Sequence, residues 1–249
     1  MRLGIIGVGH LSSFILAGLR RAGWSAGDVL LTPRGQGAAL AARHGHALAR
    51  DAGEVVDRCD LVLLAVRPAM AAEAVAGLPW RAGQVLVSAC AGVPMARLAG
   101  AVAPARVVRV MPITAAAVGA SPTVVWPQLP EVEAFLSAIG TLVPVDSEAD
   151  FETATVSAAI YGWAQALVVA GAEWSAAQGL PPDVARQLVA RTFEAAGRMQ
   201  AEDPGPMREV LASLVTPGGI TEAGLHHLEG AGALRAFEEA CAVVLRRLR

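Results

Sequence analysis

The sequence predicts an α/β domain with a parallel sheet, followed by an all-helical domain. Three observations predict this. Short, almost continuously apolar segments alternate with helical patterns from residue 2 to about Val145. Strand patterns then disappear from about Ser147 onward, and no repeat or low-complexity segment intervenes. We therefore assign residues 1–146 to the first domain and residues 147–249 to the second.

The strands of the first domain are expected where apolar residues run without interruption. We expect them at residues 2–7, 28–32, 59–66, 84–92, 105–112 and 141–145. Helical patterns fill the intervals, at residues 10–21, 37–45, 70–78, 95–102 and 131–140. Strands that are apolar on both sides are typical of a parallel sheet that helices cover on both faces.

The second domain begins with an uncharged stretch, residues 154–172. Its length could just span a bilayer, but it is rich in Ala and Gly, contains polar residues and lacks flanking Arg anchors. We expect a helix buried inside a domain or a subunit interface. A second helix should begin near Pro182, with Asp183 in its first turn, and others near residues 207–215, 221–229 and 233–249.

Composition excludes several kinds of protein. A net charge of −2 and a pI near 6.2 give no basic surface for nucleic acid. Three widely spaced cysteines favour neither a disulfide framework nor a zinc site, and His226 and His227 are adjacent, so they point to different sides of a helix. We expect no metal, no signal peptide and a cytoplasmic location. All 20 basic residues are arginine, which excludes catalysis by lysine.

The stretch "LGIIGVGHLSSFILAGL", residues 3–19, has the spacing of a dinucleotide-binding loop. Gly7 closes the turn after the strand, Gly9 lets the backbone approach a pyrophosphate, and Ser12 takes the third small position. His10 and Leu11 begin the helix whose N-terminus would face the phosphates. Glycines also mark ordinary strand–helix turns, and a histidine here could simply face solvent. The position at the head of an α/β run favours cofactor binding in a Rossmann-type domain.

The end of the second expected strand indicates which cofactor binds. NAD sites usually carry an acid there for the ribose hydroxyls, whereas this chain has Thr32 and Arg34. The nearest acid, Asp28, lies at the wrong end of the strand. Arg34 could grip a 2′-phosphate with help from the Thr32 hydroxyl, although an arginine after a strand often only faces solvent. We therefore expect NADP(H) in preference to NAD(H).

Several stretches together resemble the pyrroline-5-carboxylate reductase family. Besides the glycine loop, "LVLLAVRP" is similar to the family's A-V-K-P strand end, "VSACAGV" to V-S-x-x-A-G-I, "VVRVMP" to R-V-M-P-N-T-P and "LVTPGGITEAGL" to S-P-G-G-x-T. The resemblance implies NAD(P)H-dependent reduction of a cyclic imine carboxylate and a dimer interlocked through its helices. It also places cofactor contacts at Ala65, Val66, Arg67, Pro68 and Met111.

The "TPGGIT" segment is a candidate substrate site. Gly218 and Gly219 could point successive backbone N–H groups into one concavity, which suits a carboxylate. By resemblance, Thr221 would hydrogen-bond the ring nitrogen, and Thr216 replaces the family's serine. The segment could equally be a tight turn between helices, with Thr221 capping the second helix and Glu222 in its first turn.

The chain departs from the family where the cleft is expected. The family's N-T-P is here "ITA", and its S-G-S-G-P-A-Y falls on "SAAIYGW", residues 157–163. Ser157 is retained as a substrate contact, but the glycines are lost and Trp163 replaces the tyrosine. Tyr161, the only tyrosine, could donate a proton to the reduced nitrogen, wall a pocket for a different imine, or simply pack in the helix.

We therefore predict hydride transfer from NADPH to a C=N bond, with pyrroline-5-carboxylate and proline as the expected substrate and product. The alternatives are a paralogous imine reductase with another cyclic imine, or a non-catalytic NADP-binding protein. A β-hydroxyacid dehydrogenase shares the domain plan but relies on a lysine that this chain lacks. We expect a homodimer or higher homo-oligomer, with neither nucleic acid nor membrane as a partner.

Overall fold

The computed structural model describes residues 2–248, and contacts divide them into two compact units. Residues 2–158 and 247–248 form the first, and Ala159–Arg246 form the second. The first holds a Rossmann-type sheet and the second is helical, which confirms the predicted fold class.

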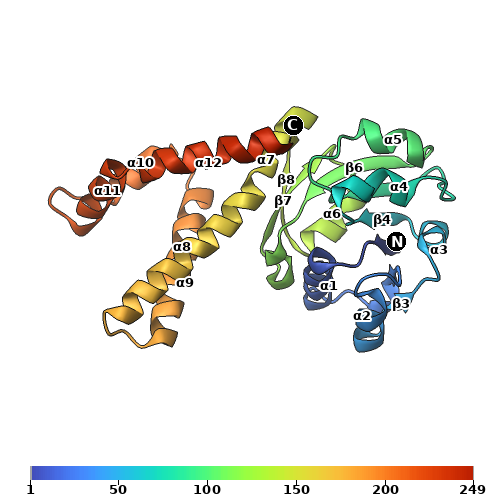
Figure 1. The fold of residues 1–249 in the computed structure, drawn as a ribbon, viewed down its shortest axis with the longest axis horizontal. Helices are drawn as coiled ribbons and strands as arrows, with labels where there is room; N and C mark the ends of the chain where they lie inside the picture. Colours follow the sequence, from blue (N-terminus) through green and yellow to red (C-terminus); the bar gives the residue numbers. More distant parts are fainter. Residues whose placement is uncertain (1, 249) are drawn as a thin grey trace. The chain divides into compact units, whose positions relative to one another are not determined.

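The first unit is built on one eight-stranded sheet in the order β3-β2-β1-β4-β5-β6-β7-β8 (Figure 1). Strands β1 to β6 pair in parallel, β7 runs antiparallel to β6, and β8 runs parallel to β7. The strands are β1 (Leu3–Ile6), β2 (Val29–Leu31), β3 (Ala47–Leu48), β4 (Leu61–Leu64), β5 (Val85–Ser88), β6 (Arg106–Met111), β7 (Ser121–Trp126) and β8 (Gly140–Pro144).

Helices alternate with these strands and then form the second unit. The first unit contains α1 (His10–Arg21), α2 (Gly37–His44), α3 (Ala52–Arg58), α4 (Ala71–Val75), α5 (Ala96–Val102), α6 (Pro130–Ser137), α7 (Glu148–Thr155) and the 3-10 helices η1 (Ala26–Asp28), η2 (Pro68–Met70) and η3 (Thr114–Val118). The chain continues through α8 (Ser157–Ala177), α9 (Pro182–Glu202), α10 (Met207–Ser213), α11 (Ile220–Gly230) and α12 (Ala233–Leu248).

Successive side chains of each central strand enter different cores. Ile5 and Leu63 join one core with Ile15 of α1 and Phe135 of α6. Ile6, the next residue after Ile5, joins the second core, which includes buried residues of α3, α4 and α5. Because both faces are covered, the strands can be apolar throughout, and this is why their sequence pattern was continuous rather than alternating.

Strand β7 was not expected, and it makes the sheet mixed rather than wholly parallel. Its sequence begins with Ser121, Pro122 and Thr123, which interrupt the apolar pattern. Within the sheet the two hydroxyl groups lie 2.9 Å apart, and Ser121 Oγ accepts a hydrogen bond of 3.0 Å from the Ile113 N–H. These buried hydroxyl groups satisfy each other locally, so a strand forms where the sequence looked too polar.

The first unit extends to Ala158, whereas we expected the helical domain to begin at residue 147. Helix α7 packs on the sheet through Phe151, which is 1% exposed. The buried Arg109 of β6 lies over the Phe151 ring, 4.4 Å from its centre, and its Nη1 is 2.8 Å from Glu148 and 2.6 Å from Glu152. These contacts make α7 part of the α/β unit.

The helical unit has almost no interior of its own. Ala185 is the one fully buried residue among its described residues. Gly171 of α8 would bring a side chain to 3.0 Å from Val189 of α9, so these two helices approach closely there. Trp163 of α8 meets Phe237 of α12 edge to face, with ring centres 5.4 Å apart.

Among residues 2–248, one helical segment is long and apolar enough to cross a membrane by length and composition alone. It covers Glu148–Ala177 and contains an 18-residue window with a mean hydropathy of 1.3, of which 11% is buried within the chain. Such a segment is weak grounds for a membrane span, because helices that pack against protein pass the same test. Burial inside its own domain, one of the two settings we expected, is not what the structure shows.

Candidate active site

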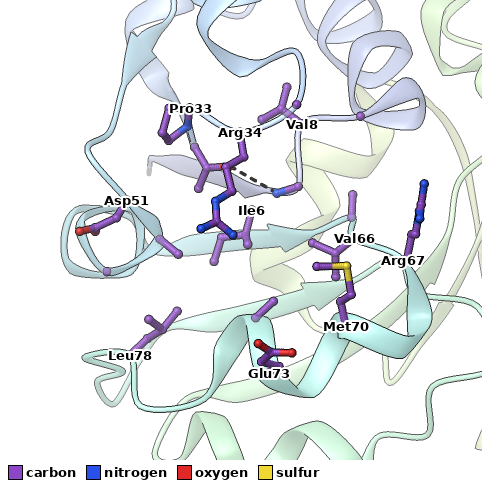
Figure 2. A pocket seen from close by; sticks show the side chains of 18 of the residues that line it. Ile6, Val8, Pro33, Arg34, Asp51, Val66, Arg67, Met70, Glu73 and Leu78 are labelled. Atoms are coloured by element: carbon purple, nitrogen blue, oxygen red, sulfur yellow. Dashed lines mark hydrogen bonds between the residues drawn. The ribbon is translucent and has the colours of Figure 1, made fainter.

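A cavity of about 830 Å³ opens at the carboxyl ends of β1, β2 and β4 (Figure 2). This edge of a parallel sheet is where open α/β folds bind their ligands. The cavity is lined by Ile6, Gly7, Val8, Gly9, Thr32, Pro33, Arg34, Gly35, Arg50, Asp51, Ala52, Gly53, Ala65, Val66, Arg67, Met70, Glu73, Ala74 and Leu78.

The glycine loop forms one wall of this cavity, and its two glycines serve different needs. Gly7 has φ +94°, and a Cβ there would lie 2.6 Å from the Ala65 carbonyl oxygen. Only glycine tolerates both conditions. At Gly9 a Cβ would meet nothing within 4 Å, so this side of the backbone faces open space. The loop therefore leaves room for a ligand to approach its backbone, as a pyrophosphate requires.

Ser12 fits the third small position by making a hydrogen bond of its own. Its side chain is completely buried, and Oγ donates to the Gly7 carbonyl at 2.7 Å. The serine therefore satisfies its hydroxyl group within the turn instead of disrupting the contact between helix and strand. The residue that departs from the usual glycine or alanine leaves the loop intact.

Helix α1 begins next to the cavity. Its N-cap, Gly9, makes no side-chain capping bond, and its first turn holds no acid, so the positive end of the helix dipole is not neutralised there. His10 is exposed and packs its ring against Phe14, with centres 4.8 Å apart, while Leu11 packs partly against the core. Neither side chain lines the cavity, so any contact with a phosphate would come from the backbone.

Thr32 lines the cavity but does not offer its hydroxyl hydrogen to a ligand. Oγ1 donates to the Ile5 carbonyl at 3.1 Å and accepts from the Gly7 N–H at 3.4 Å, the contact drawn in Figure 2. Thr32 thus ties β2 to β1 and to the glycine loop. This corrects our expectation that its hydroxyl would help to bind a 2′-phosphate, because a hydroxyl group has one hydrogen to donate.

Arg34 follows Thr32 and is exposed, and Figure 2 shows its guanidinium directed into the cavity. Gly35 pairs with Val8 through a bridge beyond the end of β2, which fixes the backbone on which Arg34 stands. Figure 2 places Arg67 on another side of the cavity, beyond Val66. The cavity is thus positively charged on both of these sides.

The end of β4 provides three of the four residues expected there. Ala65, Val66 and Arg67 line the cavity, whereas Pro68 begins η2 and is exposed without lining it. Met111 lies at the end of β6, is 7% exposed and packs against Phe151 in a separate apolar cluster. It is not part of this cavity.

Two further groups of lining residues were not anticipated from the sequence. Arg50 and Asp51 come from the turn between β3 and α3, and Gly53 comes from the first turn of α3. Met70, Ala74 and Leu78 lie four residues apart on η2, α4 and the turn that follows, and Glu73 adds a carboxylate. The pair Asp51–Glu54 has the spacing of a helix capping box, and this signal could have revealed α3.

Glu54 anchors the α3 side of the cavity. Its Oε2 accepts from the backbone N–H of Arg50 at 2.9 Å and from Arg50 Nε at 3.0 Å, while Oε1 accepts from Arg58 Nη1 at 2.6 Å. The Arg50 backbone bond, followed by the two arginine side chains, lowers the pKa of Glu54 to about 2. Glu54 is therefore ionised at neutral pH and holds Arg50 in place.

The residues of the cavity fit a phosphorylated dinucleotide. Gly9 leaves open space beside the backbone, a helix begins without an acid in its first turn, and the residues directly after β2 are Thr32, Pro33 and Arg34 rather than an acid. Apolar Met70, Ala74 and Leu78 offer a surface for an aromatic base. This combination of phosphate donors and an apolar wall suits NADP(H).

The "TPGGIT" turn differs from the expected anion site. Gly218 has φ +74°, but its N–H donates to Glu222 Oε2 at 2.7 Å, and the Gly219 N–H donates to the Thr216 carbonyl at 2.9 Å. Both amide groups that we expected to bind a carboxylate are thus occupied from within the chain. Thr221 is exposed in the first turn of α11 and does not serve as its N-cap, which is Gly219.

The other substrate-side candidates lie on α8. Ser157 is its first residue and is exposed, and Tyr161 is half-buried one turn later. Trp163, which replaces the family's tyrosine, packs against Phe237. The ring of Trp163 therefore has an aromatic packing partner within the helical unit.

Comparisons with known proteins agree with this arrangement. Residues 148–249 match the family model of the pyrroline-5-carboxylate reductase dimerisation domain, and residues 2–92 match that of the coenzyme F420-dependent NADP oxidoreductases. Pyrroline-5-carboxylate reductase of Corynebacterium melassecola is 30% identical over 263 residues, covering 96% of each chain. That of Mycobacterium tuberculosis is 31% identical over 274 residues, covering 96% of this chain and 92% of the relative.

A solved structure shows the same fold. Plasmodium falciparum pyrroline carboxylate reductase with NADP bound superposes with a TM-score of 0.87 at 20% identity, covering 100% of this chain and 97% of that chain. The fold, the full-length similarity and the order of the motifs lead to one assignment. The chain belongs to the pyrroline-5-carboxylate reductase family.

Proposed function

We propose that this protein reduces pyrroline-5-carboxylate to proline with NADPH. The observation that carries this proposal is a glycine-loop cavity suited to a phosphorylated dinucleotide, in a chain similar over 96% of its length to pyrroline-5-carboxylate reductases. The absence of lysine from the sequence is compatible with this chemistry, since reduction of an iminium needs positioning and exclusion of water more than a strong acid or base.

The preference for NADP(H) over NAD(H) is part of the proposal. Arg34 takes the place where NAD-binding chains usually carry an acid, and its guanidinium enters the cavity (Figure 2). A planar guanidinium can hold a phosphate through two parallel hydrogen bonds. Gly7, Gly9 and the first turn of α1 would bind the pyrophosphate, while Ala65, Val66 and Arg67 would line the path toward the nicotinamide.

When bound, the cofactor supplies a hydride for the carbon of the C=N bond. We assign the Thr221 hydroxyl to a hydrogen bond with the ring nitrogen and Tyr161 to delivery of its proton. Ser157, Thr216 and the amide groups of Gly218 and Gly219 would hold the rest of the substrate. Because Glu222 accepts from the Gly218 amide, its carboxylate must move aside before a substrate carboxylate can take that bond.

The helical unit supports assembly into a homodimer or larger homo-oligomer. Its exposed apolar side chains include Trp174 at 67%, Leu188 at 58% and Leu214 at 60% exposure. Surfaces of this kind are stable in water when another subunit covers them. We assign helix α8 to that interface rather than to a membrane, and we place the protein in the cytoplasm with no nucleic-acid partner.

The test is oxidation of NADPH, with NADH in parallel, against pyrroline-5-carboxylate, piperideine-2-carboxylate and an uncharged pyrroline. Turnover of pyrroline-5-carboxylate well above the other two supports the proposal. Preference for another imine would instead make the altered "SAAIYGW" segment the determinant of specificity. Saturable NADPH binding without turnover of any imine would contradict an enzymatic role and favour a cofactor-binding protein.

A further inference from the structure

A second arginine lies on the same side of the cavity as Arg34. Strands β2 and β3 pair in parallel, with Leu31 opposite Leu48, and the Ala49 N–H donates to the Leu31 carbonyl at 2.9 Å. Arg34 follows the end of β2 and Arg50 follows the end of β3. Neighbouring parallel strands therefore deliver both arginines to one edge of the sheet, and both line the cavity.

Arg50 is held by one edge of its guanidinium only. Its Nε and its backbone N–H both bond to Glu54 Oε2, at 3.0 and 2.9 Å. Within the described residues, neither Nη group of Arg50 takes part in a hydrogen bond or an ion pair, and the side chain is 87% exposed. Glu54 thus limits the orientations of Arg50 while the donors that could bind a ligand stay available.

The nearby acids do not neutralise this pair. Asp51 caps α3, accepting from the Glu54 N–H at 2.9 Å, and Figure 2 shows its carboxylate directed away from the cavity. Glu73 approaches from α4, on the wall opposite Arg34 (Figure 2). Glu54 itself is shared between Arg50 and Arg58. The side of the cavity that carries Arg34 and Arg50 is therefore left with excess positive charge.

We propose that Arg50, oriented by Glu54, forms with Arg34 a two-arginine clamp for the 2′-phosphate and so determines the choice of NADP(H) over NAD(H). This rests on the proposed function only in requiring that the cavity binds the adenosine half of the cofactor. Two guanidinium groups match the charge of a phosphate monoester better than one, and each bond is charge-assisted. Arg50 is then a residue of cofactor specificity that no motif in the sequence indicates.

Equilibrium binding tests the clamp without any turnover. We would titrate the full-length wild-type protein and the Arg50→Ala and Arg34→Ala variants with adenosine 2′,5′-bisphosphate and with adenosine 5′-monophosphate. We expect each variant to bind the bisphosphate about tenfold or more weakly, because one charge-assisted contact is lost, while binding of the monophosphate changes less than about twofold. Arg50 is a surface residue, and far-UV circular dichroism would confirm that the variants are folded.

Two further variants separate the clamp from a general loss of charge. Arg58→Ala removes the other partner of Glu54 without touching the cavity, and both ligands should bind as they do to the wild type. Glu54→Gln removes the charge that orients Arg50, and bisphosphate affinity should fall by less than in Arg50→Ala. In the wild type, raising the salt concentration should weaken the bisphosphate more than the monophosphate.

Different experimental results would contradict the clamp and the proposed reaction. Equal losses for both ligands in Arg50→Ala, or no loss for the bisphosphate, would overturn the clamp even if pyrroline-5-carboxylate is reduced. Weak binding of both ligands to the wild type would overturn it as well. Arg50-dependent discrimination in a protein that reduces no imine would leave the clamp in place and remove the proposed substrate.

Discussion

At the scale of single residues, the loop after β1 depends on a hydroxyl group. The Ser12 side chain fills the third small position and donates to the Gly7 carbonyl at 2.7 Å, within the turn that carries the cofactor assignment. Thr32 performs a similar task from β2, since its hydroxyl joins Ile5 and Gly7. Both polar side chains support the backbone of the cavity, so we expect the ligand to contact the backbone and the arginine side chains instead.

If the "TPGGIT" turn binds the substrate carboxylate as we propose, Glu222 competes with the substrate for the Gly218 N–H. Its carboxylate occupies the Gly218 N–H at 2.7 Å, so a substrate carboxylate must compete with it. We predict that Glu222→Ala lowers KM for pyrroline-5-carboxylate about three- to tenfold, the range of one exposed hydrogen bond, with kcat little changed. KM for an uncharged pyrroline should not change, because that substrate does not use the amide.

Steady-state kinetics on both imines measures this difference. Glu229, an exposed acid near the other end of α11, provides a matched control, and Glu229→Ala should leave both KM values as they are. A fall in KM of equal size for the charged and the uncharged imine would show that Glu222 does not act through the Gly218 amide.

These residues also show where sequence patterns stop being informative. The spacing of Gly7, Gly9 and Ser12 was enough to predict the loop. A φ of +94° and the nearby Ala65 carbonyl limit Gly7 to glycine, whereas Gly9 leaves open space beside the backbone. The spacing could not predict that Thr32 donates within the fold, or that the Gly218 and Gly219 amides are already bonded. The Thr32 bond depends on Ile5, which is distant in sequence, and the Gly218 bond depends on the rotamer of Glu222.

At the scale of elements, helix α7 is fixed to the sheet by a buried arginine. Arg109 pairs with Glu148 and Glu152 and lies over Phe151, while Glu148 also accepts from the Met95 N–H at 2.6 Å. The Arg109 guanidinium thus connects β6 with α7, and Glu148 of α7 in turn bonds to Met95 at the start of α5. The sequence of residues 148–155 gave no sign of this, because the partners come from distant parts of the chain.

We predict that Arg109→Met destabilises the protein by about 2–3 kcal/mol. Removing one partner of a fully buried pair costs ~3–5 kcal/mol, and the cost is smaller here since Glu148 is 33% exposed. Chemical denaturation followed by tryptophan fluorescence would measure the change. The matched triple variant with Glu148→Gln and Glu152→Gln should recover part of the loss, and no recovery would contradict an electrostatic origin.

The corner between α2 and β3 contains a histidine that favours the neutral form. Burial is the main cause that lowers the pKa of His46, and the charge of Arg20 adds to it, while the Ala26 carbonyl, 3.4 Å from Nδ1, opposes the shift. Because the folded pKa is the lower one, the contribution to stability is complete above the unfolded value of about 6.5 and is lost as the pH falls below it.

We therefore predict that the melting temperature of the wild type falls more steeply than that of His46→Asn between about pH 7 and pH 5. Thermal denaturation at several pH values would measure the two slopes. His44 lies beside His46, with ring centres 6.3 Å apart, and desolvation, followed by the charge of Arg20, lowers its pKa as well. Because His44 is less buried than His46, His44→Asn should reduce the slope less than His46→Asn does. Equal slopes for the wild type and His46→Asn would contradict this assignment.

Which elements could be predicted depended on how completely they are buried. Strands β1, β4 and β5 are covered on both faces, and their apolar sequences reveal them. Strand β6 is also recognisable, although Arg106 and Arg109 interrupt its apolar run. Strand β7 escaped prediction because its hydroxyl groups pair inside the sheet, and β3 is only two residues long. Helix α3 is seven residues long, and its one sequence signal is the capping-box spacing of Asp51 and Glu54. Arg50 precedes this box directly and carries no motif of its own.

At the scale of the whole molecule, the two units differ in how they bury apolar residues. The α/β unit has cores on both faces of its sheet, whereas the described part of the helical unit fully buries Ala185 alone. The sequence predicted the helices and their apolar character. A single chain does not contain what covers them, so the extent of the exposed surface became visible only in the structure.

We predict that Leu188→Glu dissociates the oligomer. Leu188 is 58% exposed on α9, in line with Val184 one turn before it, and a charge on a face that another subunit covers would be buried without a partner. Light scattering at micromolar concentration would detect the smaller species. Gln187→Glu adds the same charge to the neighbouring exposed position and should keep the wild-type mass; a monomeric wild type would contradict the proposed assembly itself.

Because the helical unit has almost no interior, its stability cannot be described for a single chain alone. If the apolar faces of α8 and α9 are covered only by a second copy, then folding of this half of the chain and encounter between chains are the same event. A free energy of unfolding would then have no value until the protein concentration is stated. A newly made chain would complete its fold only after finding another like itself.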